Sequence, residues 1–159
     1  MKIVVLCGGV STEREVSLRT STKVSTALQI KGHDVVMIDV FFGEKELPVF
    51  EGTKDFAAKA NEYRELDPLI TKERIEKTGL MGPNVAEICR LADIVFIGLH
   101  GANGEDGKIQ AFFEEEGIRY TGSDSVSSAI AMSKAETKKI VAPFIRMPEG
   151  IVLHKGDTE

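Results

Sequence analysis

Three uninterrupted apolar runs constrain the fold of this chain more than any other feature of its sequence. They are KIVVL at residues 2–6, DVVMIDV at 34–40 and DIVFIGL at 93–99. Strands without polar alternation are typically buried on both faces, as in parallel sheets covered by helices. The sequence therefore predicts an α/β fold, with an open, mostly parallel, Rossmann-like sheet and helices on both faces.

The segments between these runs indicate helices in the alternating order that a parallel sheet requires. After the first run, Val16, Val24, Ala27 and Leu28 recur at helical spacing, and Gly32 is a natural helix stop. Prolines and scattered charges favour a surface excursion between 41 and 83 with one or two short helices. Further helices are expected at 84–92, 107–117 and 125–142, and further short strands at 118–122 and 149–155.

Length, charge and cysteine content narrow the classes of protein to which the chain can belong. Its 159 residues suit one ordinary domain, and a net charge of −5 offers no basic surface for nucleic acid. No apolar run approaches the roughly 20 residues of a membrane span, and the apolar start is too short for a secretory signal, so we expect a cytoplasmic protein. Cys7 and Cys89 lie in apolar segments and are expected to be buried, reduced thiols.

Polar loops rich in glycine follow three of the predicted strands. They read GGVSTERE at 8–15, HGANGEDG at 100–107 and TGSDS at 121–125. In an open α/β sheet, ligands bind outside the carboxyl ends of the strands, and glycine permits close backbone approach. Three such loops on one edge of the sheet predict a binding site there.

The first loop favours a cationic ligand group over a phosphate. GGVSTER fits neither the G-x-G-x-x-G nor the G-x-x-x-x-G-K-[ST] pattern, and its carboxylates suit an ammonium. Thr12 and Glu15 have the T-x-x-E spacing of a capping box, so Glu15 could instead serve only to begin the following helix. Glu13 has no structural role of that kind.

His100 ends the third apolar run and begins the second loop, a position well placed to touch a ligand. Glu105 and Asp106 are expected to cap the helix at 107–117. The histidines are dispersed and predict no metal cage, and GVSTE is not the G-x-S-x-G elbow of a serine nucleophile.

Three motifs carry a family resemblance: GGVSTEREVSL at 8–18, LHGANGEDGKIQAFFEEEGIRYTGS at 99–123 and SAIAMSK at 128–134. Together they resemble the D-alanine–D-alanine ligases, which are ATP-grasp carboxylate–amine ligases, over nearly the whole chain except about 42–83. The resemblance implies a Rossmann-like (pre-ATP-grasp) domain of an enzyme that joins two D-alanines for peptidoglycan synthesis. In that reaction ATP is cleaved to ADP and phosphate through a D-alanyl phosphate.

The resemblance also implies roles for residues of all three loops. Glu13 would hold the ammonium of the first D-alanine as a catalytic and substrate-binding residue, and His100 would lie near that substrate's carboxylate. Gly122 is implied to bind substrate and Ser123 to act catalytically beside it. The network implied to steady the site from behind comprises Glu15, Ser17 and Tyr120.

Two positions depart from the family pattern, and both bear on ATP. Lys134 matches the lysine implied to reach the ATP phosphates, but Ser133 stands where the family has an aspartate before it. Asp124 stands where the family's TGSG motif has its last glycine, which adds a negative charge near the expected phosphates. No metal ligand is implied in this chain.

Length is the largest departure. A complete ligase of this family has central and C-terminal ATP-grasp domains that hold ATP and Mg²⁺, whereas this chain would supply the N-terminal substrate-side domain at 1–147 and a truncated start of the central domain at 148–159. We therefore expect no cofactor on this chain alone and no activity from it, and we expect the complete protein to take D-alanine and form a homodimer. The open alternatives are a stand-alone, non-catalytic D-amino-acid-binding or dimerisation module, and a fragment of a D-alanine–D-lactate or D-serine ligase.

Overall fold

The structure confirms the parallel sheet that the three apolar runs predict. It is a computed structural model that describes residues 1–153 and 156. β1 (Lys2–Cys7), β2 (Asp34–Asp39) and β3 (Ile94–Ile97) form a parallel sheet in the order β2-β1-β3. In this register Val4 of β1 lies between Val36 of β2 and Val95 of β3.

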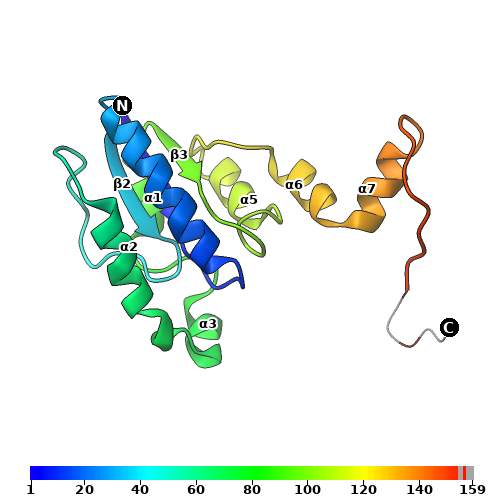
Figure 1. The fold of residues 1–159 in the computed structure, drawn as a ribbon, viewed down its shortest axis with the longest axis horizontal. Coiled ribbons are helices and arrows are strands. Elements are labelled where there is room, and N and C mark those ends of the chain that lie inside the picture. Colours follow the sequence, from blue (N-terminus) through cyan, green and yellow to red (C-terminus); the bar gives the residue numbers. More distant parts are fainter. Residues whose placement is uncertain (154–155, 157–159) are drawn as a thin grey trace.

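Helices cover both faces of the sheet, as expected (Figure 1). α1 (Arg14–Ile30) and α2 (Phe56–Glu65) pack on one face, and α4 (Val85–Arg90) and α5 (Lys108–Glu115) on the other. The excursion between β2 and α4 holds α2, the 3-10 helix η1 (Asp67–Leu69) and α3 (Lys72–Thr78), so it contains the expected short helices and one further helical turn.

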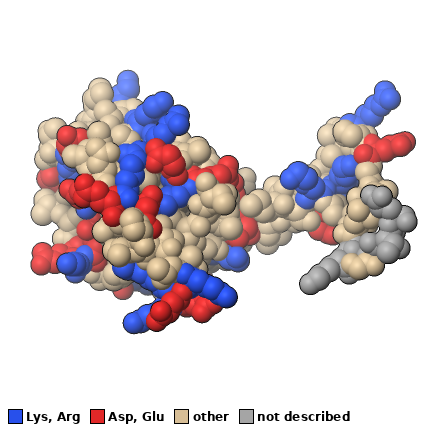
Figure 2. All heavy atoms as spheres, turned by 60° about the horizontal axis from the view of Figure 1, so that its bottom comes forward, with Lys and Arg blue, Asp and Glu red and all other residues tan. Residues whose placement is uncertain are grey.

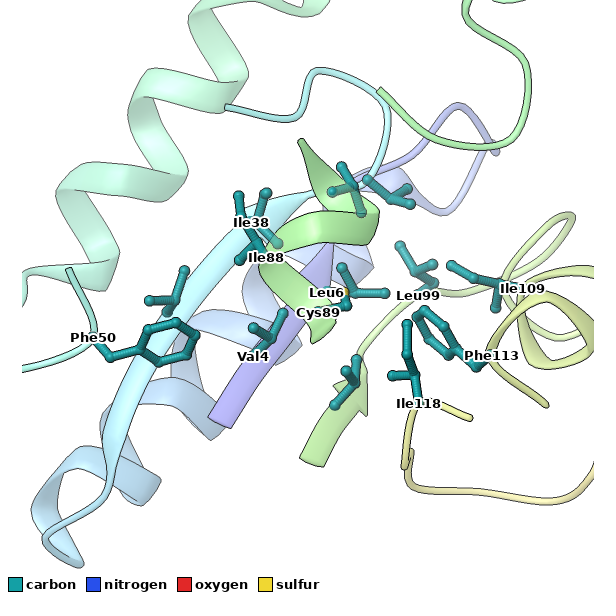
Figure 3. Packing of buried hydrophobic residues seen from close by; sticks show 14 residues of the cluster. Val4, Leu6, Ile38, Phe50, Ile88, Cys89, Leu99, Ile109, Phe113 and Ile118 are labelled. Carbon is teal, nitrogen blue, oxygen red and sulfur yellow. The ribbon is translucent and has the colours of Figure 1, made fainter. Parts of the chain in front are cut away.

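Side chains that alternate along β1 divide the core into two clusters. Val4 and Leu6 pack with Ile88 and Cys89 of α4 and with Phe113 of α5 (Figure 3). The cluster on the opposite face of the sheet includes Ile3, Val5, Cys7, Leu18 and Phe56. Both cysteines are free and buried, as the sequence predicts. The β1 side chains from Ile3 to Cys7 are all buried and divide between the two clusters, and burying one aliphatic side chain contributes roughly 1.5–3 kcal/mol.

In place of the fourth strand expected at 118–122, the structure has a single β-bridge beside β3. Tyr120 forms an isolated parallel bridge with Val95. The Val95 amide donates to the Arg119 carbonyl at 2.8 Å, and the Thr121 amide donates to the Val95 carbonyl at 2.9 Å. The strand expected at 149–155 is wrong for its described part, because 149–153 have no regular structure, and 154–155 lie outside the described residues.

The single helix expected at 125–142 is also wrong, because the chain turns at Ser133. α6 (Ser125–Met132) ends there and α7 (Lys134–Val141) begins, with Ser133 in an extended conformation at φ −94° and ψ 104°. The Ser133 hydroxyl accepts from the Glu136 amide at 3.3 Å and so caps α7. Thr137 holds the two helices together by donating its hydroxyl to the Ile130 carbonyl at 2.8 Å.

α6, α7 and residues 142–153 form an arm that extends away from the body (Figure 1). Figure 2 shows charges of both signs on the body and on the outer arm, joined by a stretch without charge that corresponds to α6. The large apolar side chains that the arm exposes are Val126, Met132, Ile140, Phe144, Ile145, Ile151, Val152 and Leu153. Among the described residues, no helix is long and apolar enough to cross a membrane.

Candidate functional site

The charged run Glu13–Arg14–Glu15 after β1 points in three directions. Arg14 turns into the protein and is 7% exposed. Glu15 turns outward and accepts two hydrogen bonds from Arg64 of α2, each at 2.9 Å, and this pairing lowers the pKa of Glu15. The capping-box alternative is therefore wrong, since α1 begins after Glu13 without a side-chain cap and the Glu15 carboxylate is engaged elsewhere.

Glu13 lies against the second loop. A side-chain carbon added at Gly101 would stand 3.1 Å from Oε2 of Glu13, which places that carboxylate beside the backbone that follows His100. Ser11 joins the same two loops, because its hydroxyl donates to the His100 carbonyl at 2.7 Å. The first and second loops therefore meet at the carboxyl edge of the sheet, as their positions after β1 and β3 predict.

Ser17 fixes both loops from beneath. Its hydroxyl accepts from the Gly8 amide at 3.0 Å and donates to the Gly98 carbonyl at 2.6 Å. Ser17 is fully buried on α1, so these bonds satisfy backbone groups that have no access to water. This geometry supports the steadying role implied for Ser17.

His100 carries one ring nitrogen that is both shielded from solvent and without a hydrogen-bond partner among the described residues. Its Nδ1 lies 3.7 Å from the Glu105 carboxylate, whereas its Nε2 is shielded from solvent and has no hydrogen-bond partner in the part of the chain that the structure describes. Glu105 also accepts from the Gly101 amide at 2.8 Å, so it braces the loop instead of capping α5. Asp106 does reach α5, by accepting from the Lys108 amide at 3.3 Å.

A narrow cleft opens between these loops. Gly8, Gly9 and Ser11 line one side, and Leu99, His100 and Asn103 line the other. Gly79 and Leu80, from the turn after α3, close its third side. The cleft measures about 10 Å³, which is room for about one water molecule. An amino acid could enter only if one of these walls moved.

The third loop lies beside the cleft without lining it. Thr121 accepts from the Ile97 amide at 3.4 Å and so follows the end of β3. Gly122 has φ 122° and open space around it. Ser123 is exposed, and its carbonyl accepts from the Ser128 hydroxyl at 3.4 Å. The Glu13 carboxylate thus lies beside the loop of His100 but is not among the residues that line the cleft, and Gly122 and Ser123 do not line it either.

Tyr120 ties the third loop to α5. Its hydroxyl donates to the Glu114 carboxylate at 2.6 Å, and the same carboxylate accepts from the Ser125 amide at 2.8 Å. Partial burial and the bond to Glu114 raise the pKa of Tyr120 to about 12. Tyr120 therefore supports the base of the arm and does not face the cleft.

The two departures from the family pattern are both helix caps. Asp124 accepts from the Ser127 amide at 2.8 Å at the start of α6, and Ser133 caps α7. Aspartate and serine are about equally good at this position, so Ser133 can replace an aspartate without loss of the cap. Lys134 follows on the exposed arm, away from the cleft.

A second set of residues at the site has no strong signal in the sequence. Arg14 forms a buried ion pair with Asp39, the last residue of β2. Gly8 has φ 73°, and a side chain there would overlap the Asp39 carboxylate. Burial opposes the charge of Arg14, but Asp39 and Asp67 outweigh it and raise the pKa of its guanidinium. Within the described residues, no group of three or more His, Cys, Asp or Glu side chains could hold a metal ion.

Fold and loops together define an α/β domain whose first and second loops meet over a narrow cleft at the carboxyl edge of its parallel sheet. Residues 2–123 match the sequence model of the family described as D-ala D-ala ligase N-terminus, and the chain belongs to this family. The match ends where the arm begins.

The curated relatives that the chain matches are D-alanine–D-alanine ligases. The chain is 44% identical to a D-alanine–D-alanine ligase of Pediococcus pentosaceus, with 99% of this chain and 47% of that protein covered. It is 43% identical to a D-alanine–D-alanine ligase of Lacticaseibacillus casei, with 89% of this chain and 42% of that protein covered. The chain thus spans less than half the length of these relatives.

Solved structures agree on the fold. A D-alanine–D-alanine ligase from Bacillus anthracis complexed with ATP covers 100% of this chain with 42% of its own length, at 28% identity and a TM-score of 0.66. A D-alanine–D-alanine ligase from Aeromonas hydrophila has a TM-score of 0.63 at 23% identity, and this likeness concerns the fold alone.

Proposed function

We propose that this chain is the N-terminal, substrate-side part of a D-alanine–D-alanine ligase, which joins two D-alanines with cleavage of ATP to ADP and phosphate for peptidoglycan synthesis. The observation that carries the proposal is the meeting of the Glu13 carboxylate with the loop that bears His100, at the carboxyl edge of the sheet. The family to which the chain belongs supports it.

The charges of these residues suit the two ends of an amino acid. The Glu13 carboxylate would bind the ammonium of the first D-alanine, since a charge-assisted hydrogen bond is roughly twice as strong as a neutral one. The shielded Nε2 of His100, which lacks a protein partner among the described residues, would serve the substrate's carboxylate. Gly122 and Ser123 would approach the same substrate from the third loop, with Ser123 acting in catalysis.

The ATP chemistry would belong to a part of the protein beyond this domain. Bound ATP would activate the first carboxylate as an acyl phosphate for attack by the second amine. The described part of the chain has no cluster of side chains that could bind Mg²⁺. At the position that matches the family's phosphate-binding lysine it offers one exposed residue, Lys134. This domain therefore does not fit a complete nucleotide site. We therefore propose that this chain alone is inactive and binds no cofactor.

The exposed arm supports a division of the protein into domains. We propose that residues 1–147 form the substrate-side domain and that 148–159 begin a central ATP-grasp domain. Phe144 and Ile145 are 83% and 56% exposed, and the relatives are about twice as long as this chain. Apolar side chains gathered on an arm fit a surface that another domain covers, which favours a ligase part over a stand-alone binding module.

We further propose a cytoplasmic homodimer. The free, buried cysteines suit a reducing compartment. Light scattering of the longer protein should give the mass of a dimer, and the mass of one chain would contradict this.

The test uses the longer ligase, with dipeptide formation and ADP release as readouts. Glu13→Gln should lower kcat/KM for D-alanine by about ten- to a hundredfold, because the glutamine oxygen can still accept from the ammonium but the opposite charge is lost. Glu46→Gln, an exposed position in the excursion, is the matched control and should behave as the unsubstituted protein. An equal effect of both variants would contradict the role of Glu13. Preference for D-lactate or D-serine as the second substrate would identify the related ligases instead.

A further inference from the structure

The Arg14 side chain connects four segments that are far apart in the sequence. Its Nη1 donates to the Gly9 carbonyl at 2.9 Å and to the Asp39 carboxylate. Its Nε donates to Asp67 at 2.7 Å, and its Nη2 donates to the Tyr63 carbonyl at 3.1 Å. The guanidinium therefore holds the first loop, the end of β2, α2 and η1 in one arrangement. Only arginine offers several donors in such a fixed planar fork.

One of these contacts bears directly on the candidate substrate loop. Arg14 follows Glu13 in the chain, and its bond to the Gly9 carbonyl returns to the start of the same loop. The loop between Gly9 and Arg14 is therefore fastened at both ends by one side chain. Ser11, in the middle of that loop, carries the constraint to the His100 carbonyl.

Two further contacts of Arg14 reach the excursion between β2 and α4. Tyr63 and Asp67 lie at the end of α2 and in η1. The Asp67 carboxylate is 46% exposed, so burial of Arg14 does not require it, and Asp39 already supplies a buried counter-charge. Asp67 instead orients the guanidinium of Arg14, because it accepts from Nε and so fixes the rotation of the guanidinium plane.

We propose that Arg14 is a positioning residue for the substrate loop, and that the excursion acts through Asp67 and Arg14 to set the place of the Glu13 carboxylate. This inference rests on the proposed function of Glu13. It predicts that a surface change in the excursion alters affinity for D-alanine without any contact with it.

The test compares Asp67→Ala with the matched control Glu73→Ala in the longer ligase. Both remove one exposed carboxylate of the excursion, and Glu73 forms no ion pair within the described part of the chain. Asp67→Ala should raise KM for D-alanine about two- to fivefold with KM for ATP unchanged, as suits a half-exposed ion pair. Glu73→Ala should change neither. A lower kcat with an unchanged KM for D-alanine would indicate a merely structural role and overturn the proposal.

Amide NMR shifts of this 159-residue chain give a second readout that needs no activity. Asp67→Ala should move the Gly9 and Gly101 signals, and Glu73→Ala should leave them in place. Shifts confined to residues near 67 would overturn the positioning role. If the unsubstituted longer protein formed no D-alanyl-D-alanine, the proposed function would fall, and the Gly9 and Gly101 shifts would still decide whether Arg14 transmits the change.

Discussion

Replacing Gly8 by alanine should remove a large part of the stability of the domain. Gly8 has φ 73°, where a residue with a side chain is strained by about 1–2 kcal/mol. The added carbon would also overlap the Asp39 carboxylate and stand 2.5 Å from Nη1 of Arg14, so the buried pair must separate. Breaking a buried pair costs about 3–5 kcal/mol. The two effects together amount to about 4–7 kcal/mol, against a total of roughly 5–15 kcal/mol for a domain.

Gly32→Ala separates the two effects. Gly32 has a similar φ of 81°, but no heavy atom lies within 4 Å of an added carbon, so only the backbone strain remains. Urea titrations followed by far-ultraviolet circular dichroism measure both variants. We expect Gly32→Ala to lose about 1–2 kcal/mol and Gly8→Ala to lose several times more, or to be unfolded without urea. Equal losses within about 1 kcal/mol would refute the reasoning, because the ion pair would then tolerate the side chain.

Three further outcomes follow from contacts around the site and the arm. Ser17→Ala should lower the free energy of unfolding by about 1–3 kcal/mol, since it leaves the buried Gly8 amide unbonded, and a loss below about 0.5 kcal/mol would speak against that bond. The amide and hydroxyl of Ser127 lower the pKa of Asp124, so the α6 cap should be intact above the ordinary carboxyl pKa of about 4 and fail as the pH falls through the lowered value. A protection factor of the Ser127 amide against hydrogen exchange that stays constant over this pH range would contradict this. Burial raises the pKa of Cys89 to about 12 and also raises that of Cys7, so neither thiol should react with a disulfide reagent near about pH 8 until urea unfolds the chain.

The sheet could be predicted because its evidence is local. Each strand is a short, continuous apolar run, and burial on both faces leaves few other structures for such a run. The two meeting loops could be predicted for the same reason, since parallel strands bring their carboxyl ends to one edge. Glu13 and His100 needed only this topology to be placed near each other.

The break at Ser133 was missed although a local signal for it exists. Ser133 and Glu136 have the S-x-x-E spacing of a helix start, and the hydroxyl indeed accepts from the Glu136 amide. Met132 and Lys134, on either side of Ser133, are both good helix formers, so helix propensity alone favours a continuous helix. The residue pattern alone does not show whether the Ser133 cap or the helix propensity of its neighbours prevails, because that depends on the path of the folded chain.

The links made by Arg14 could not be predicted at all. Asp39 and Asp67 are separated from Arg14 by β2 and by the excursion, and no periodicity indicates that they meet. The wall that Leu80 adds to the cleft is of the same kind, because the turn after α3 reaches the sheet edge only in the folded chain. Arg14 and Leu80 are identified only from contacts in the folded chain, whereas strands and helix caps can be predicted from residue patterns.

The strand order β2-β1-β3 also sets when the site can assemble during folding. β1 meets β2 across about 30 residues but meets β3 across about 90, so closing the second loop costs roughly 1 kcal/mol more in chain entropy. The unit from β1 to β2 can therefore form first, with Glu13 already in its loop and Arg14 already beside Asp39. His100 arrives only when β3 docks, so the cleft is among the last features of the domain to form and, by the same route, among the first to be lost on unfolding.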